Sequence, residues 1–199
     1  PVEADLVTGV PESGNAAALG FSLESGIPYG TAFVKNSYVG RTFIKPKQSS
    51  RESSVQVKLN VLRESVKGKR VVMIDDSIVR GTQLRETTEF LYRSGAKEVH
   101  IRIGCPPLLF VCKYLNFSRS TSEMELIARR VIMELEGEEG FNHIEEYSNG
   151  ETERGRALRK TICEKFNFAS LEFQSLEGII KAIGLPACKL CTYCWNGKG

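Results

Sequence analysis

One segment constrains the fold more than any other part of this chain of 199 residues. It opens with the apolar run Val71–Ile74, continues through the polar stretch Asp75–Gly81, and enters a helical pattern at Thr82. A short apolar strand followed by a polar loop and an amphipathic helix is typical of a parallel sheet covered by helices. Ligands of such sheets bind at the carboxyl ends of the strands. The sequence therefore predicts an α/β fold with a binding site directly after Ile74.

The same alternation recurs on both sides of this segment. Asp5–Val10 is a predicted strand, Ala16–Ser25 a predicted helix, and Thr31–Lys35 the next predicted strand. Val99–Ile103 is a further strand, after the helix that begins at Thr82. This order predicts an open, mostly parallel sheet flanked by helices, with Thr31–Lys35 among the parallel strands.

Other segments are less regular. Asn36–Arg51 is a predicted long loop, rich in Lys and Arg and without an acidic residue, and loops of this length are usually functional or disordered. Val55–Val66 fits either a strand or a helix, and the charge-rich stretch Glu136–Lys160 is interpreted as a surface excursion. Ser170–Phe173 is a predicted strand and Leu176–Ile183 a predicted helix.

Composition limits the classes of function. Hydrophobic residues make up 41% and charged residues 26%, as in soluble domains, and the net charge of +3 is too small to indicate a nucleic-acid partner. The most apolar stretch, Ile101–Cys112, contains Arg102 and two prolines and is shorter than the about 20 residues that cross a bilayer. The first residues lack the features of a signal peptide. We therefore expect a cytoplasmic protein with neither a nucleic-acid nor a membrane partner.

The polar loop after Ile74 has a specific chemistry. Asp75 and Asp76 end the strand, and carboxylates there suit ligand hydroxyls and Mg²⁺. Ser77–Thr82 leads into a helix N-terminus, where backbone amides bind phosphate. Together they describe a site for a ribose 5-phosphate. The alternative is a strand end with two solvated acids and an ordinary helix cap.

Three of the six cysteines form Cys188-x2-Cys191-x2-Cys194. In a reduced compartment this clustering indicates a metal or iron–sulfur site more than a disulfide framework. A zinc site and unligated thiols remain the alternatives.

The chain resembles a known family at four places. Val71–Thr82 is similar to the phosphoribosyl pyrophosphate (PRPP) binding signature of the type I phosphoribosyltransferases. Gly9–Ser13, Lys35–Pro46 and Cys188–Cys194 narrow the resemblance to the phosphoribosyltransferase region of the amidophosphoribosyltransferases, and Lys35–Pro46 is the most specific of them. The resemblance extends from about Ala4 to Ile103 and then weakens.

This resemblance implies a type I phosphoribosyltransferase fold with a C-terminal helical, cysteine-rich appendage. Residues 1–112 would form the phosphoribosyltransferase core, and residues 113–199 the helical extension with its Cys-rich tail. The family's N-terminal glutaminase domain is absent from this chain. We therefore expect a fragment of a longer protein or, as the alternative, a stand-alone transferase that uses free ammonia or a partner subunit. The resemblance also implies a homo-oligomer.

The activity implied is that of a glycosyltransferase of de novo purine biosynthesis, transferring a pentosyl group. It would form 5-phosphoribosylamine and pyrophosphate from PRPP and glutamine-derived ammonia. Two alternatives are a PRPP-binding regulatory domain and a phosphoribosyltransferase with a different acceptor. The order of residues in Lys35–Pro46 favours the amidotransferase.

Residue roles are implied by the same resemblance. The positions expected to bind PRPP are Glu12, Ser13, Lys35, Asp75, Asp76, Ser77, Arg80, Gly81 and Thr82. Ser13, Asp75 and Asp76 are also the positions linked to Mg²⁺. Tyr38 and Arg41 are the implied catalytic residues, in a loop that closes over bound PRPP.

For the cysteines, the resemblance implies a [4Fe–4S] cluster in the full-length protein. Its ligands in this chain would be Cys112, Cys188 and Cys191, and the fourth ligand would lie upstream of residue 1. Cys194 could substitute for the fourth ligand, but its position is usually not a ligand in the family.

Overall fold

The computed structural model describes residues 2–35, 59–112, 114 and 122–198. The chain forms two compact units. The first consists of Pro1–Asp75 and Thr82–His100, and the second of Asp76–Gly81 and Ile101–Gly199.

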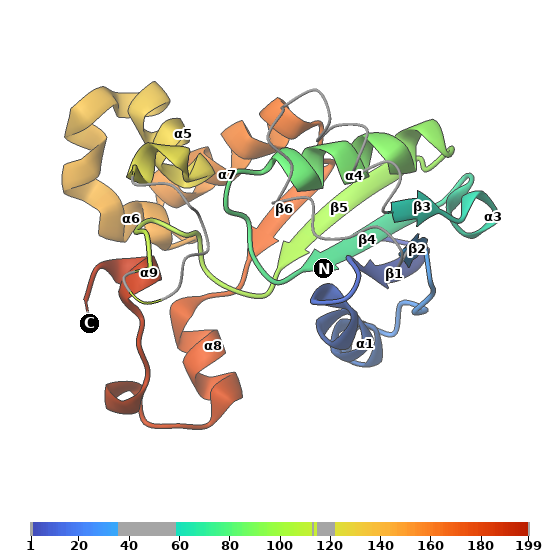
Figure 1. Ribbon diagram of the computed structural model, residues 1–199, viewed down its shortest axis with the longest axis horizontal. Helices are drawn as coiled ribbons and strands as arrows, with labels where there is room; N and C mark the ends of the chain where they lie inside the picture. Colours follow the sequence, from blue (N-terminus) through green and yellow to red (C-terminus); the bar gives the residue numbers. More distant parts are fainter. Residues whose placement is uncertain (1, 36–58, 113, 115–121, 199) are drawn as a thin grey trace. The chain divides into compact units, whose positions relative to one another are not determined.

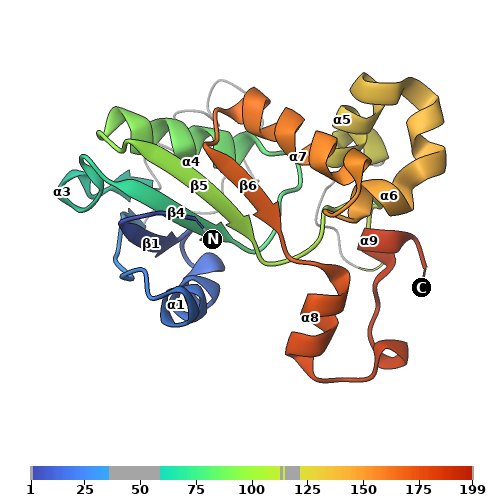
Figure 2. The ribbon, with the colours of Figure 1, turned by 180° about the vertical axis from the view of Figure 1, so that it is seen from behind.

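The first unit holds the beginning of the main sheet. Its elements are β1 (Leu6–Gly9), α1 (Gly14–Ser25), β2 (Phe33–Lys35), β3 (Leu59–Val61), α3 (Arg63–Val66), β4 (Arg70–Asp75), α4 (Thr82–Arg93) and the start of β5 (Glu98–Ile103). The strands β1 and β4 pair in parallel, with Leu6 opposite Val71 and Gly9 opposite Ile74. Helices α1 and α4 lie on opposite sides of these strands (Figures 1 and 2). The predicted parallel sheet flanked by helices is confirmed.

The second unit contains the remainder of β5 and the C-terminal elements. Its helices and strand are α5 (Ile127–Glu136), α6 (Ile144–Ser148), α7 (Glu153–Phe166), β6 (Ser170–Phe173), α8 (Leu176–Ile183) and α9 (Tyr193–Asn196). Short 3-10 helices cover Glu123–Glu125, Gly137–His143 and Ala187–Lys189. The strand order of the main sheet is β1-β4-β5-β6, so β5 is the strand that runs through both units.

Apolar strands hold α1 in place. All four residues of β1 are buried, as are the last five of β4. Ala18 of α1 packs with Val7, Val72 and Ile74 in one buried cluster. Because a strand between two layers of helices is buried on both faces, it carries a continuous apolar run and not an alternating one. This explains why the run Val71–Ile74 was a reliable signal.

The prediction that Thr31–Lys35 joins the parallel sheet is wrong. Strand β2 pairs antiparallel with β3 in a separate two-stranded sheet. The cause lies in the preceding turn, because Val7 N–H donates to Pro28 O (2.8 Å) and Gly30 N–H donates to Val7 O (2.9 Å). The free edge of β1 is thus already occupied before β2 begins.

The interpretation of Glu136–Lys160 as a surface excursion is also wrong. This stretch forms a 3-10 helix, α6 and the first half of α7. Tyr147 and Leu158 are almost fully buried, as is Ile162 one turn after Leu158. Residues four apart share one helix face, so α7 is an amphipathic helix whose many charges face solvent.

A buried arginine organises part of the second unit. Arg129 donates from Nε to Leu109 O (2.6 Å) and pairs through Nη2 with Glu123 (2.8 Å). Its guanidinium also lies over the rings of Phe110 and Phe141, 4.7 and 4.9 Å from their centroids. Burial lowers the pKa of Arg129, yet the carboxylate and the two ring faces stabilise its charge. Arg129 therefore fixes the segment Leu109–Phe110 against α5.

Within the described residues, no helix is both long enough and apolar enough to cross a membrane.

The loop between β1 and α1 is packed so closely, on itself and on β4, that only glycine fits at two positions. A Cβ on Gly9 would lie 2.6 Å from Asn15 N, and a Cβ on Gly14 would overlap Ile74 O. Helix α1 accordingly starts at Gly14, two residues before the predicted helix. The close approach brings this loop onto the carboxyl end of β4.

We expect Gly14→Ala to destabilise the protein by about 1–3 kcal/mol, because the added methyl group collides with main chain that cannot move aside. Urea unfolding at equilibrium measures the change. Gly20→Ala is the matched control, since a Cβ there has open space around it and alanine favours a helix by up to about 1 kcal/mol. Equal stability of the two variants would contradict the packing described.

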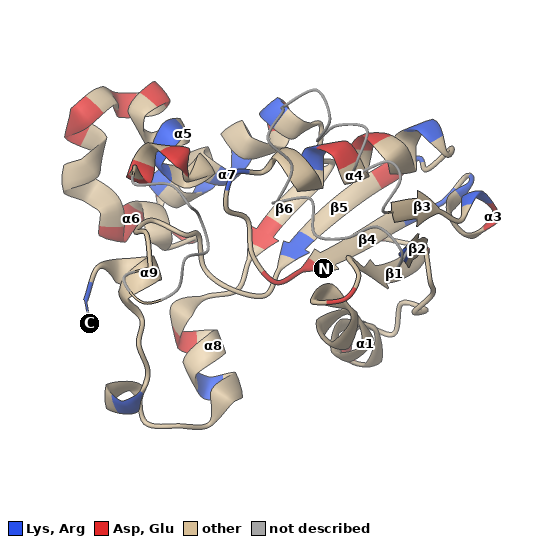
Figure 3. Ribbon diagram, in the orientation of Figure 1, with Lys and Arg blue, Asp and Glu red and all other residues tan. Residues whose placement is uncertain are grey.

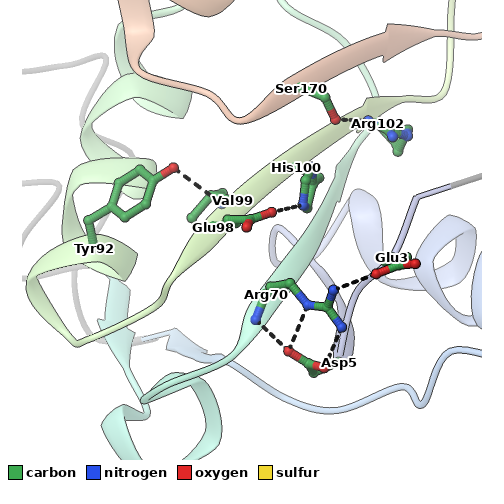
Figure 4. Close-up of polar contacts among 9 residues, drawn as sticks. All are labelled: Glu3, Asp5, Arg70, Tyr92, Glu98, Val99, His100, Arg102 and Ser170. Atoms are coloured by element: carbon green, nitrogen blue, oxygen red, sulfur yellow. Dashed lines mark hydrogen bonds and ion pairs between the residues drawn. The ribbon is translucent and has the colours of Figure 1, made fainter.

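A charged contact fastens the start of the chain to β4 (Figure 4). Asp5 accepts hydrogen bonds from the main-chain N–H of Arg70 (2.8 Å) and from its guanidinium, which also contacts Glu3 (3.0 Å). These bonds from Arg70 lower the pKa of Asp5 to about 2 from an ordinary 3.8.

Because the pKa of Asp5 is depressed in the folded state, its stabilising contribution is present above about pH 4 and is lost as the pH falls toward 2. We expect the stability difference between the wild type and Asp5→Asn to be largest near neutral pH and to narrow steadily below about pH 4. Urea titrations over this range measure it. Glu24→Gln, at an exposed position of α1, is the control; a difference independent of pH would refute the assignment.

Candidate active site

Two strand ends meet in the first unit. Since β1 and β4 are adjacent and parallel, the loop after β1 reaches the last residues of β4. Val10 N–H donates to Ile74 O (2.8 Å), and the Ser13 hydroxyl donates to Asp75 Oδ1 (3.3 Å). Two predicted PRPP-binding residues, Ser13 and Asp75, are thereby brought together from positions 62 residues apart.

The neighbouring pair of predicted residues is Glu12 and Lys35. Lys35 Nζ lies 3.1 Å from Glu12 Oε1, and both side chains remain accessible to solvent. Glu12 directly precedes Ser13, so four of the predicted PRPP-binding residues lie around one loop of the first unit.

The electrostatics of this loop favour an anion beside the carboxylates. Helix α1 starts at Gly14 and has no acidic residue in its first turn. Figure 3 shows this helix almost without charged residues. Gly14 N–H and Asn15 N–H donate to Val10 O and Glu12 O, so the positive potential at this end of α1 comes from the helix dipole. Lys35 brings a positive charge that Glu12 balances, while the buried Asp75 supplies a carboxylate for a cation or a hydroxyl.

The loop between β4 and α4 carries the other predicted residues. In the second unit, the Ser77 hydroxyl donates to Asp76 Oδ2 (3.3 Å), and Arg80 forms an ion pair with Glu125. Gly81 has a φ of +80°, and a Cβ there would collide with the ring of Phe166. Thr82, in the first unit, is the first residue of α4. The contact with Glu125 was missed by the sequence analysis, because nothing in the local pattern links residues 45 positions apart.

Tyr38 and Arg41, the predicted catalytic residues, lie outside the described residues, as does the rest of the predicted long loop from Asn36 to Arg51.

The predicted iron–sulfur ligands Cys112, Cys188 and Cys191 all lie among the described residues. Cys188 and Cys191 are exposed, and Cys112 is half-buried. The thiol next to Cys112 is that of Cys194: burial, a hydrogen bond with Cys112 and the nearby Cys191 raise the pKa of Cys194 to about 11. The amides of Leu109 and Phe110 both donate to Cys194 O, at 2.9 and 3.1 Å.

These thiols do not form a complete metal site. Among the residues that the structure describes, no three potential ligands are grouped as they would be around a metal ion. Cys194, which the sequence suggested only as a substitute ligand, is the thiol that contacts Cys112. Its spacing from Cys191, the same two-residue gap as between Cys188 and Cys191, was the available signal.

The comparison with known proteins agrees with the geometry of the sheet and of the loops after β1 and β4. A family model described as a phosphoribosyl transferase domain matches residues 22–105. The fold, the loop geometry and this match define a type I phosphoribosyltransferase domain.

The relatives narrow the class further. The amidophosphoribosyltransferase of Mycobacterium tuberculosis is 43% identical over 199 residues, which is all of this chain and 33% of that protein. That of Archaeoglobus fulgidus is 44% identical over 200 residues and is covered to 38%. The chain belongs to the amidophosphoribosyltransferase family, as its phosphoribosyltransferase region, and it spans about a third of the length of these curated relatives.

Solved structures give the same result. The glutamine PRPP amidotransferase of B. subtilis, complexed with ADP and GMP, matches with a TM-score of 0.73 at 40% identity. The match covers 99% of this chain and 38% of that one. A structure described as the allosteric regulatory enzyme of purine biosynthesis matches with a TM-score of 0.74 at 39% identity, over 99% of this chain and 37% of that one. The resemblance recognised in the sequence is thus confirmed.

Proposed function

We propose that this chain is the phosphoribosyl-transferring part of an amidophosphoribosyltransferase of de novo purine biosynthesis. Ammonia released from glutamine by a separate glutaminase domain would replace the pyrophosphate of PRPP, giving 5-phosphoribosylamine and pyrophosphate. The observation that carries the proposal is the contact of Ser13 with Asp75, which joins the loop after β1 to the end of β4. The match to named amidophosphoribosyltransferases along the whole chain supports the choice of ammonia as acceptor.

In this proposal each loop takes one part of PRPP. Asp75 and Asp76 bind the ribose hydroxyls, and the amides of Ser77–Thr82 bind the 5-phosphate. The loop from Glu12 to Gly14 and the Lys35 side chain receive the pyrophosphate. Tyr38 and Arg41 complete the site from the predicted long loop.

Mg²⁺ suits the donor set. Ser13 and Asp75 are in contact, and hydroxyl and carboxylate oxygens are the ligands that Mg²⁺ prefers. Bound together with Asp76 and substrate oxygens, the ion would neutralise charge on the departing pyrophosphate.

The residues of the chain act by position and charge. Lys35 and the positive end of the α1 dipole stabilise the negative charge that builds on the leaving pyrophosphate, while Asp75 and Asp76 hold the ribose in place. The anomeric carbon becomes positively charged as pyrophosphate departs, and ammonia attacks it. Exclusion of water is essential, since water would compete for the same carbon. No side chain needs to act as a nucleophile.

The further expectations are part of the same proposal. A boundary near residue 112 separates the phosphoribosyltransferase core from the C-terminal extension, and the protein acts as a cytoplasmic homo-oligomer together with its glutaminase domain. A PRPP-binding regulator and a transferase with another acceptor are the competing functions, and the match to amidophosphoribosyltransferases along this whole chain disfavours both.

The activity is tested on the natural-length protein with PRPP, Mg²⁺ and ammonium at alkaline pH, by following pyrophosphate release. We expect release that depends on ammonium. Asp75→Asn combined with Asp76→Asn should reduce it by roughly 100-fold or more, because both ribose contacts and magnesium ligands are lost.

Glu89→Gln, an exposed carboxylate on α4, is the charge-matched control and should keep full activity. Unchanged activity of the double variant would disprove the site. PRPP binding without turnover by the folded wild type would instead establish a regulator.

We also propose a [4Fe–4S] cluster held by Cys112, Cys188 and Cys191 in the natural-length protein. Because Cys194 contacts Cys112, Cys194 is the alternative to Cys188 as a ligand of the cluster.

Iron content and absorption of protein purified without oxygen test the cluster. Cys112→Ser and Cys191→Ser should lose iron, and whichever of Cys188→Ser and Cys194→Ser also loses it identifies the remaining ligand. Cys163→Ser, a half-buried thiol of α7, is the control and should retain iron. Wild-type protein without iron would exclude the cluster.

A further inference from the structure

The loop between β4 and α4 is held by the first turn of α5. Val79 O accepts a hydrogen bond from Ile127 N–H (2.8 Å), and Arg80 O accepts one from Arg130 Nη2 (2.8 Å). Two successive carbonyls of the loop are therefore bound by residues three apart on one helix. All four residues belong to the second unit.

Side chains fix the same loop. Ile78 is buried, the Arg80 guanidinium is paired with Glu125, and Gly81 lies against the ring of Phe166. Three consecutive loop residues, 79 to 81, thus contact the C-terminal part of the chain.

The two carbonyl bonds set the direction of two amides. A trans peptide unit is planar, and its C=O and N–H point to opposite sides. The carbonyl of Val79 shares a peptide unit with the amide of Arg80, and the carbonyl of Arg80 shares one with the amide of Gly81. With both carbonyls bound to α5, both amides are directed away from that helix. Neighbouring amides aligned in this way form an anion-binding arrangement.

We propose that Arg130 is a positioning residue for phosphate binding by this loop. It acts through the Arg80 carbonyl, so that the amides of Arg80 and Gly81 are already oriented before the 5-phosphate of PRPP arrives. This inference rests on the proposed function for the identity of the ligand. Arg130 itself is exposed, which separates its effect on the loop from an effect on the stability of the fold.

The other contacts are less suitable for a test. The Ile127 bond comes from the main chain, so no side-chain substitution other than proline removes its donor. Glu125 is paired with the Arg80 guanidinium, so its replacement would release a side chain that is itself assigned to PRPP. Among the described residues, the hydrogen bond from Arg130 to the loop goes to a main-chain oxygen and to no side chain assigned to PRPP.

The test compares Arg130→Met and Arg130→Lys with the wild type, in the natural-length protein. The matched control is Arg156→Met, because Arg156 also donates to a main-chain oxygen, that of Glu151 beside α7. Three quantities are measured: the Kd for PRPP with Mg²⁺ by calorimetry, hydrogen exchange of the Arg80 and Gly81 amides without ligand, and the thermal midpoint.

We expect Arg130→Met to bind PRPP roughly tenfold more weakly, as for the loss of one charge-assisted hydrogen bond, and to exchange these two amides faster. Its thermal midpoint should stay that of the wild type. Arg130→Lys retains a donor and should recover most of the affinity, and Arg156→Met should match the wild type.

Wild-type affinity or unchanged amide exchange in Arg130→Met would overturn the inference. So would a lowered thermal midpoint with faster exchange throughout α5, which indicates a purely structural role. A wild-type protein that binds no PRPP would overturn the proposed function instead, and the exchange rates, measured without ligand, would then decide the role of Arg130 in the loop by themselves.

Discussion

The parallel pairing of β1 with β4 determines where the chemistry of the first unit is located. The hydrogen bond from Val10 N–H to Ile74 O extends this pairing beyond β1. Gly14 then packs against the same carbonyl, where no side chain would fit. The start of α1, the Ser13 hydroxyl and the Asp75 carboxylate are fixed by this single contact between main chains. A shift of the strands by one residue would separate all three.

The sequence predicted the elements that a local pattern encodes. Val71–Ile74 is a continuous apolar run, as expected of a strand covered on both faces. Gly26 directly after α1 and Gly95 two residues after α4 both adopt positive φ. The parallel sheet and its strand-end acids could therefore be derived. The partner of β2 could not, because it depends on hydrogen bonds that Pro28 and Gly30 make with β1 and that leave no periodic signal.

The site contacts that the sequence did not predict are contacts between residues far apart in the chain. The pairing of Arg80 with Glu125 and the closeness of Cys194 to Cys112 both join segments far apart in the sequence. The residue types indicated that these side chains can bind ions or metals, but they did not indicate which of them are in contact. A resemblance to a family assigns roles only to residues within the shared motifs. It therefore includes Ser13 and Asp75, which are in contact in the structure, but it does not include Glu125, which lies outside those motifs.

Both described cations that are assigned to PRPP have a glutamate partner in the same unit. Lys35 pairs with Glu12, and Arg80 pairs with Glu125. Ion pairs as exposed as these contribute about 0–1 kcal/mol, so a multiply charged phosphate can displace the carboxylates at small cost. The carboxylates keep the two cations in place and limit their repulsion of other positive groups until the substrate binds.

The hydrogen bonds from Leu109 and Phe110 to the carbonyl of Cys194 also have a consequence for synthesis of the protein. They connect residues about 85 positions apart, and contacts of such long sequence separation form late in folding. While the ribosome is still adding the last helices, Arg129 and Phe110 can already pack together, but Cys112 has no neighbouring thiol. The thiols of Cys112 and Cys194 therefore come together only after translation has passed residue 194, when the rest of this unit can already be folded.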